Sequence, residues 1–272
     1  MKKAAIFDMD GTLVANSPVH IRAFEIFCAR YGVTDWREKL ANGFGMGNDD
    51  IMRLVMPEEV IREKGLAALA DEKEAIYREI YAPDIRPVEG LKELLERLRA
   101  AGIPCAVGSS GCKANVDFVL DSCAIRPYFD AAISGDMVSR CKPDPEIYLT
   151  AAAALGVSPA DCVIFEDARA GFEAARRAGA GRIMALTTTL PREERSAGRW
   201  PTGSSTHSPT STTSTRCWPE RAPIRSLKTG RNNFRGRKNA VCKILLLLRG
   251  QKRVSCSREL PPFCCSSSPT PS

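Results

Sequence analysis

Apolar and polar positions alternate along the first two thirds of the chain in a pattern that predicts strands and helices in turn. Short apolar runs typical of strands buried on both faces occur at 4–7, 103–107, 131–134, 162–165 and 183–187. Segments with helical spacing of apolar residues separate the later runs, as at 91–98. Strands separated by helices of this length predict an α/β fold with a doubly wound parallel sheet.

The long interval between the first two apolar runs has a different character. Helical spacing occurs at 18–31, 49–55 and 57–81, with a glycine-rich break at 42–48 and no strand pattern. We therefore expect a small all-helical cap domain, residues 16–86, inserted after the first strand; this segment is called the helical insert below. The core domain would comprise residues 1–15 and 87–190.

The pattern stops near residue 191. Residues 191–272 are rich in Ser, Thr, Pro and Arg and show no sustained period. One interpretation is a linker or disordered basic tail. A sharper hypothesis is that a frameshift or assembly error has replaced the native end, which resequencing the coding DNA around codon 195 would test.

Charge and cysteine content bear on partners and compartment. The net charge of +7 suggests nucleic acid, but 14 Lys and Arg against 2 Glu follow residue 195, leaving 25 basic and 30 acidic residues before it. Because the body is mildly acidic, we expect no nucleic-acid partner. The six body cysteines lack zinc-site spacing and indicate free thiols in a reducing compartment. The chain has neither a signal-peptide pattern nor a membrane-length apolar run, so we expect a cytoplasmic monomer without a membrane partner.

The first strand runs directly into Asp8, Asp10 and Gly11. Side chains alternate along a strand, so Asp8 and Asp10 share one side, at the strand end where ligands bind in open α/β sheets. Two neighbouring carboxylates favour a cation, and oxygen ligands favour Mg²⁺. The alternative is that both residues merely cap a turn.

Polar residues also follow the other predicted strands: Ser109, Lys142, and Glu166 with Asp167. A parallel sheet brings these ends to one edge, and the set suits phosphoryl transfer, in which positioning and charge neutralisation dominate. Taken singly, Ser109 could be a helix N-cap, Lys142 a surface charge, and the two acids a helix-end cap. Their recurrence at successive strand ends favours the functional interpretation.

These motifs together resemble the haloacid dehalogenase superfamily, in its phosphatase and phosphoglucomutase-like branch with a helical cap. The matching segments are Asp8–Leu13, Gly108–Ser110, Lys142–Tyr148 and Phe165–Ala168 with Ala170-Gly171, in the family's order over residues 1 to about 190. The tail has no counterpart in that pattern.

The resemblance implies roles for individual residues. Asp8 would attack phosphorus and form an aspartyl-phosphate, while Asp10 would protonate the leaving oxygen and later deprotonate water. Ser109 and Lys142 would hold phosphate oxygens. Asp8, the backbone carbonyl of Asp10 and Asp167 would bind Mg²⁺, with Glu166 beside them. The helical insert would close as a lid.

Substrate-binding residues are expected at His20, Gly45, Asn48 and Ser110. His20 could equally be an ordinary polar residue on its helix. Asn48 stands where the resembling β-phosphoglucomutase has an arginine for a second phosphate, and Ala15 replaces the usual acid. Arg53 or Arg78 could compensate, although solvated helix charges are commoner. These departures favour a small sugar monophosphate as substrate.

Three hypotheses follow from the sequence. The first is a Mg²⁺-dependent phosphatase acting on a small phosphate ester. The second is a hexose-phosphate mutase, which would interconvert sugar phosphates and release little phosphate. The third is a non-enzymatic nucleic-acid binder working through the basic tail, which would bind in a strongly salt-dependent way.

Overall fold

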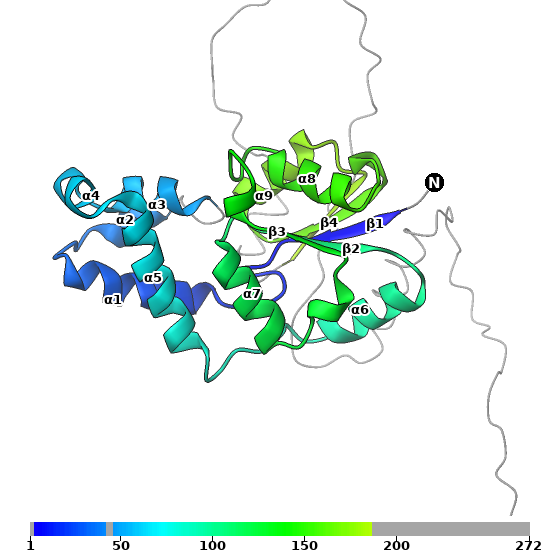
Figure 1. The fold of residues 1–272 in the computed structure, drawn as a ribbon, viewed down its shortest axis with the longest axis horizontal. Helices are drawn as coiled ribbons and strands as arrows, with labels where there is room; N and C mark the ends of the chain where they lie inside the picture. The colour runs from blue at the N-terminus through cyan, green and yellow to red at the C-terminus, as the bar shows by residue number, and fades with distance from the viewer. Residues whose placement is uncertain (1–2, 42–45, 187–272) are drawn as a thin grey trace, which may run out of the picture.

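The computed structural model describes residues 3–41 and 46–186 of the 272-residue chain (Figure 1). Its described strands form one sheet in the order β3-β2-β1-β4-β5, and every neighbouring pair is parallel. The strands are β1 Ala4–Phe7, β2 Cys105–Gly108, β3 Ala131–Ile133, β4 Cys162–Glu166 and β5 Arg182–Ala185. The predicted α/β class with a parallel sheet is therefore confirmed.

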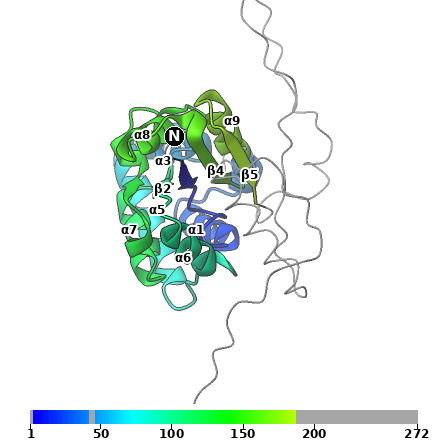
Figure 2. The same cartoon turned by 90° about the vertical axis from the view of Figure 1, so that its right-hand side faces the viewer.

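Helices cover both faces of this sheet. In Figure 1, α8 and α9 lie above the strands and α6 and α7 below, and the end view of Figure 2 agrees for α8, α9 and α6. Their bounds are α6 Leu91–Ala100, α7 Lys113–Ser122, α8 Glu146–Ala154 and α9 Arg169–Arg177. Short 3₁₀ turns occupy η1 Arg126–Tyr128, η2 Gly135–Met137 and η3 Pro159–Asp161.

Successive side chains of the central strand β1 lie on opposite faces of the sheet. Ala4 and Ile6 belong to the hydrophobic cluster that contains α8 and α9 residues, whereas Ala5 and Phe7 belong to the cluster that contains α6 and α7 residues. All four residues are at most 1% exposed. This alternation is what a strand buried on both faces requires, and it explains the uninterrupted apolar run.

Among the described residues of the helical insert, the regular secondary structure is entirely helical. They are α1 Ser17–Arg30, α2 Trp36–Leu40, α3 Asn48–Val55, α4 Glu58–Lys64 and α5 Leu66–Tyr81. The helical spacing did not predict α2. The stretch 57–81, predicted as one helical segment, is divided at Gly65, whose φ of 82° is readily adopted only by glycine.

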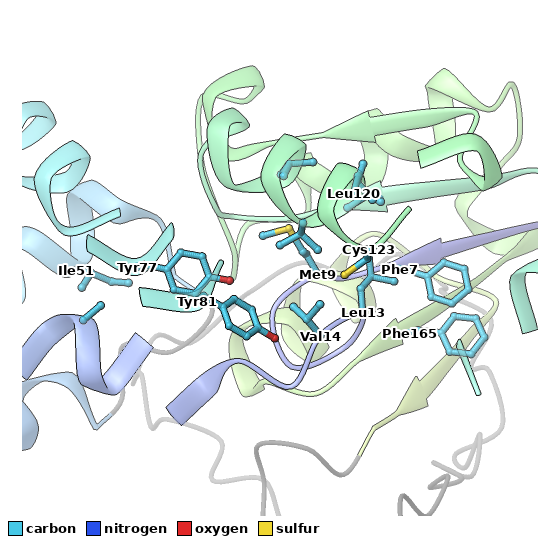
Figure 3. Close-up of a cluster of buried hydrophobic side chains, with 14 of the residues drawn as sticks. Phe7, Met9, Leu13, Val14, Ile51, Tyr77, Tyr81, Leu120, Cys123 and Phe165 are labelled. Atoms are coloured by element: carbon cyan, nitrogen blue, oxygen red, sulfur yellow. The ribbon is translucent and has the colours of Figure 1, made fainter. Parts of the chain in front are cut away.

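The helical insert and the sheet share one continuous hydrophobic cluster. Figure 3 shows Tyr77 and Tyr81 of α5 beside Met9, Leu13 and Val14, which follow β1. This contact anchors the insert next to the carboxyl end of β1. None of the described helices is long and apolar enough to cross a membrane. Residues 191–272, for which we predicted a tail, lie outside the described residues.

Candidate active site

The carboxyl end of β1 carries the two predicted acids. The backbone N–H of Asp8 donates to the Phe165 carbonyl at 3.0 Å, so the pairing of β1 with β4 continues to Asp8. Gly11 turns the chain with a φ of 77°. Asp8 and Asp10 then line the same pocket, called the central pocket here. The structure thus brings both predicted acids to one site.

Lys142 reaches this strand end from the loop before α8. Its Nζ lies 2.5 Å from Asp8 Oδ1 and 2.8 Å from Glu166 Oε1, and the residue is 1% exposed. Burial alone favours the neutral amine, but the Asp8 and Glu166 carboxylates hold the pKa of Lys142 well above its usual value. Lys142 is therefore a buried ammonium ion, not a surface charge.

Glu166 is fixed at the end of β4 by four hydrogen bonds. Its Oε1 accepts from Lys142 and from the Tyr148 hydroxyl at 2.8 Å, and its Oε2 accepts from the backbone N–H groups of Asp167 and Ala168. Burial, followed by the Glu166 charge, raises the pKa of Tyr148 well above its usual value, so its hydroxyl stays a donor. The sequence motif contained Tyr148, but no role had been predicted for it.

Asp8, Glu166 and Asp167 form a buried acidic cluster. One carboxylate oxygen from each lies within 4.8 Å of the others. Burial raises the pKa of Asp8 well above its usual value; Lys142 opposes this effect, and the Glu166 and Asp167 charges add to it. Such crowded oxygen donors fit a hard divalent cation such as Mg²⁺. The Asp10 carboxylate is not part of this cluster, and the role predicted for its backbone carbonyl stays a prediction.

Asp10 instead faces the helical insert. Its Oδ1 accepts a 2.6 Å hydrogen bond from Asn16 Nδ2 and lies 3.5 Å from His20 Nε2. Burial would raise the pKa of Asp10, but His20, Asn16 and Lys73 outweigh it and hold that pKa below its usual value. Asp10 is thus an ionised carboxylate held by donors, which suits a general base.

The loop after β2 supplies the hydroxyl groups. The backbone N–H of Ser109 donates to Ile133 at 2.9 Å, and its Oγ accepts from the N–H of Gly111 at 3.0 Å. Ser110 Oγ accepts from the backbone N–H of Lys142 at 3.3 Å. Both serines line the central pocket. Ser110 also fixes the loop that carries Lys142.

On the side of the helical insert, a polar network reaches the pocket. The His20 ring stacks on Tyr77 with centroids 4.0 Å apart, and its Nδ1 lies 2.9 Å from Lys73 Nζ. Lys73 Nζ in turn donates to Glu74 Oε1 at 2.8 Å, and Asn115 Nδ2 donates to Glu74 Oε2 at 2.7 Å. This network joins α1 and α5 to α7.

The remaining predicted substrate residues are placed unequally. His20 and Asn48 line the central pocket, and Gly45 lies outside the described residues. Arg53 is exposed and pairs with Asp50, while Arg78 donates to Asn115. Neither arginine is among the residues that line the described pocket, and a compensating role for either stays a prediction.

Several residues in or beside the pocket were missed from the sequence. Asn16 is fully buried: its Oδ1 accepts from Gly11, and its Nδ2 donates to Asp10 and to Tyr77. Lys73 and Glu74 lie on α5 among other charged residues, so they resemble ordinary solvated helix charges. The adjacency of Lys73 and Glu74 at positions of helical spacing that should be apolar was the only local signal.

Comparison with known proteins supports the resemblance. The family model of haloacid dehalogenase-like hydrolases matches residues 2–179. The chain is 32% identical over 212 residues to protein CbbY of Rhodobacter capsulatus, covering 73% of this chain and 91% of that protein. It is 32% identical over 177 residues to the fructose-1-phosphate phosphatase YqaB of Escherichia coli, covering 64% and 91%.

A solved structure is also similar to this chain. CbbY from Rhodobacter sphaeroides, in complex with xylulose-(1,5)bisphosphate, matches with a TM-score of 0.60 and 28% identity, over 73% of this chain and 92% of that chain. The fold and these relatives define the class of the chain as a phosphatase. It belongs to the haloacid dehalogenase-like hydrolase family, as its motifs predicted.

Proposed function

We propose that the chain is a Mg²⁺-dependent phosphomonoester hydrolase that acts on a small phosphorylated metabolite, a sugar phosphate, through an aspartyl-phosphate on Asp8. The observation that carries this proposal is the Lys142 ammonium between Asp8 and Glu166, beside the acidic cluster. The similarity to the fructose-1-phosphate phosphatase YqaB supports the substrate class.

The first half-reaction transfers the phosphoryl group to the protein. An Asp8 oxygen attacks phosphorus while the bond from phosphorus to the leaving oxygen breaks, and Asp10 donates its proton to that oxygen. Asp10 is ionised at rest; the approach of a phosphate dianion favours its protonation, because a nearby like charge raises a carboxyl pKa. Lys142 and Ser109 hold the phosphate oxygens.

The second half-reaction restores the enzyme. Asp10 takes a proton from water, the resulting oxygen attacks phosphorus, and the bond to Asp8 breaks to release inorganic phosphate. Asp8 and Asp167 would hold Mg²⁺, because the four hydrogen bonds to Glu166 already engage both of its oxygens. When bound, the ion masks negative charge on the phosphate and on Asp8.

The helical insert, residues 16–86, serves in this proposal as a cap that opens for substrate and closes for chemistry over a core of residues 1–15 and 87–190. The central pocket has a volume of about 80 Å³, less than the roughly 150 Å³ of a cavity that holds benzene. This small volume supports a movement of the insert when a sugar phosphate enters. Gly47 lies against Cys141 of the core, as expected for a closed position.

The test is phosphate release from p-nitrophenyl phosphate and from a panel of sugar monophosphates by the full chain. We expect release that requires Mg²⁺, stops with EDTA and is abolished by Asp8→Asn. The matched control is Asp71→Asn, which removes an exposed carboxylate from α5 and should retain full activity. Sugar-phosphate interconversion with little release would favour the mutase hypothesis instead.

A further inference from the structure

Glu74 of α5 is a buried carboxylate on the side of the central pocket that the helical insert forms. It is 2% exposed and lines the same pocket as Asp8 and Asp10. Although burial would raise the pKa of Glu74, Lys73 and His20 together with the Asn115 hydrogen bond hold it below its usual value. A negative charge therefore stands where the part of the substrate beyond the reacting phosphate must lie.

The charge of Glu74 cancels that of Lys73. The Lys73 ammonium lies 2.8 Å from Glu74 Oε1, and both side chains are 3% exposed. Lys73 is the sole lysine or arginine that the described part of the helical insert contributes to the pocket lining. Residues 42–45, outside the described part, read Asn-Gly-Phe-Gly and carry no charge. Among the lysine, arginine, aspartate and glutamate side chains of residues 16–86 that line the described pocket, the charges of Lys73 and Glu74 therefore cancel.

Neighbours on two helices hold Glu74 in place. Asn115 of α7 donates to Glu74 Oε2 at 2.7 Å, and Arg78, one turn further along α5, donates to Asn115 Oδ1 at 2.8 Å. Both ends of the Asn115 amide are therefore used. Because of these contacts the carboxylate cannot swing away from an incoming anion without breaking two buried hydrogen bonds.

We infer that Glu74 is the residue that determines charge selectivity, so that the enzyme accepts an uncharged, hydroxyl-bearing leaving group and rejects one that carries a second phosphate. This inference rests on the proposed phosphatase function and narrows its substrate to polyol or sugar monophosphates. Glu74 accepts hydrogen bonds from hydroxyl groups, whereas a phosphate dianion has none to donate and is repelled. Specificity of this kind comes from a repulsive element built into the pocket.

The experiment compares fructose 1-phosphate with fructose 1,6-bisphosphate, both as substrates and as competitive inhibitors of p-nitrophenyl phosphate hydrolysis. The wild-type protein should prefer the monophosphate. Glu74→Gln keeps the shape and frees the Lys73 ammonium to pair with the second phosphate. We expect it to shift the ratio of the two inhibition constants toward the bisphosphate by about tenfold, as expected for loss of one like charge in a partly buried site.

Glu79→Gln is the matched control, because it removes the same charge from an exposed position of α5. It should leave the ratio unchanged. A wild-type protein that binds the bisphosphate as well as the monophosphate would overturn the inference, and so would a Glu74→Gln ratio equal to that of Glu79→Gln.

A second variant should change the discrimination between the two substrates in the opposite direction. Lys73→Gln leaves the Glu74 charge without its ammonium partner and should make the discrimination against the bisphosphate about tenfold stronger. A shift toward the bisphosphate would contradict the inference even if Glu74→Gln fails to fold. The proposed function fails separately, through the absence of Mg²⁺-dependent phosphate release by the wild-type protein.

Discussion

The amine of Lys142 lies 2.5 Å from Asp8 Oδ1, although 134 residues separate the two in sequence. Both residues are buried, and Glu166 holds the same amine from the other side. One ammonium ion thus compensates two carboxylates at the centre of the sheet edge. Its removal leaves buried negative charge without a partner, which is costly in a protein interior.

Lys142→Met should therefore damage both stability and activity. We expect a loss of about 3–5 kcal/mol in the free energy of unfolding and a fall in kcat/KM on the order of a hundredfold or more. Urea unfolding and p-nitrophenyl phosphate kinetics measure the two effects. Lys113→Met, at an exposed lysine on α7, should change neither, and equal behaviour of the two variants would argue against a role for Lys142.

Gly171 leaves room for the Glu166 carboxylate. A Cβ atom at residue 171 would overlap that carboxylate, so Gly171→Ala must displace either Glu166 or α9. We expect a destabilisation of about 1–3 kcal/mol and a fall in kcat of roughly a hundredfold, although alanine normally favours helix. Thermal unfolding and kinetics test this, and a more stable, fully active variant would show that Glu166 is not held there.

Gly47 of the helical insert lies against Cys141, in the core loop before Lys142. A Cβ on Gly47 would lie 2.9 Å from Cys141 Cβ, closer than such atoms come in proteins. Gly47→Ala should therefore hinder closure and lower kcat/KM by about tenfold. Cys141→Gly removes the obstructing atoms, so the double variant should recover activity. Purely additive losses in this double-mutant cycle would contradict a closing contact.

The Glu74 charge should also be visible in the pH dependence of stability. Its pKa in the folded protein lies below the ordinary value of 4.5, so its stabilising contribution is fully present above 4.5 and is lost as the pH falls through the folded pKa. The difference in unfolding free energy between the wild type and Glu74→Gln should be largest at neutral pH and shrink below 4.5. Urea titrations at several pH values measure it; a difference independent of pH would exclude an ionised Glu74.

The sequence predicted the sheet and the acids at its edge because both depend on local patterns. The strand β1 is an uninterrupted apolar run, and Asp8 and Asp10 follow it directly. The chain direction of a parallel sheet then places Ser109, Lys142 and Glu166 at the same edge. No knowledge of distant contacts was needed for that step.

The residues that were missed depend on contacts between distant segments. Asn16 is joined to Tyr77 across 61 residues, and Asn115 to Glu74 across 41. Such pairings depend on how α5 packs against α1 and against α7, which periodicity does not contain. The split at Gly65 was missed because the apolar spacing continues through it, whereas the backbone turns with a positive φ.

The central claim is that Asp8 accepts the phosphoryl group, and covalent trapping tests it most directly. Asp10→Asn should form the aspartyl-phosphate from p-nitrophenyl phosphate, since nitrophenolate leaves without a proton donor, but should hydrolyse it slowly because no base activates water. After acid quenching, peptide mass spectrometry should find one phosphoryl group on Asp8. Continued phosphate release with Asp8 unmodified, or with the group on Ser109, would contradict the account.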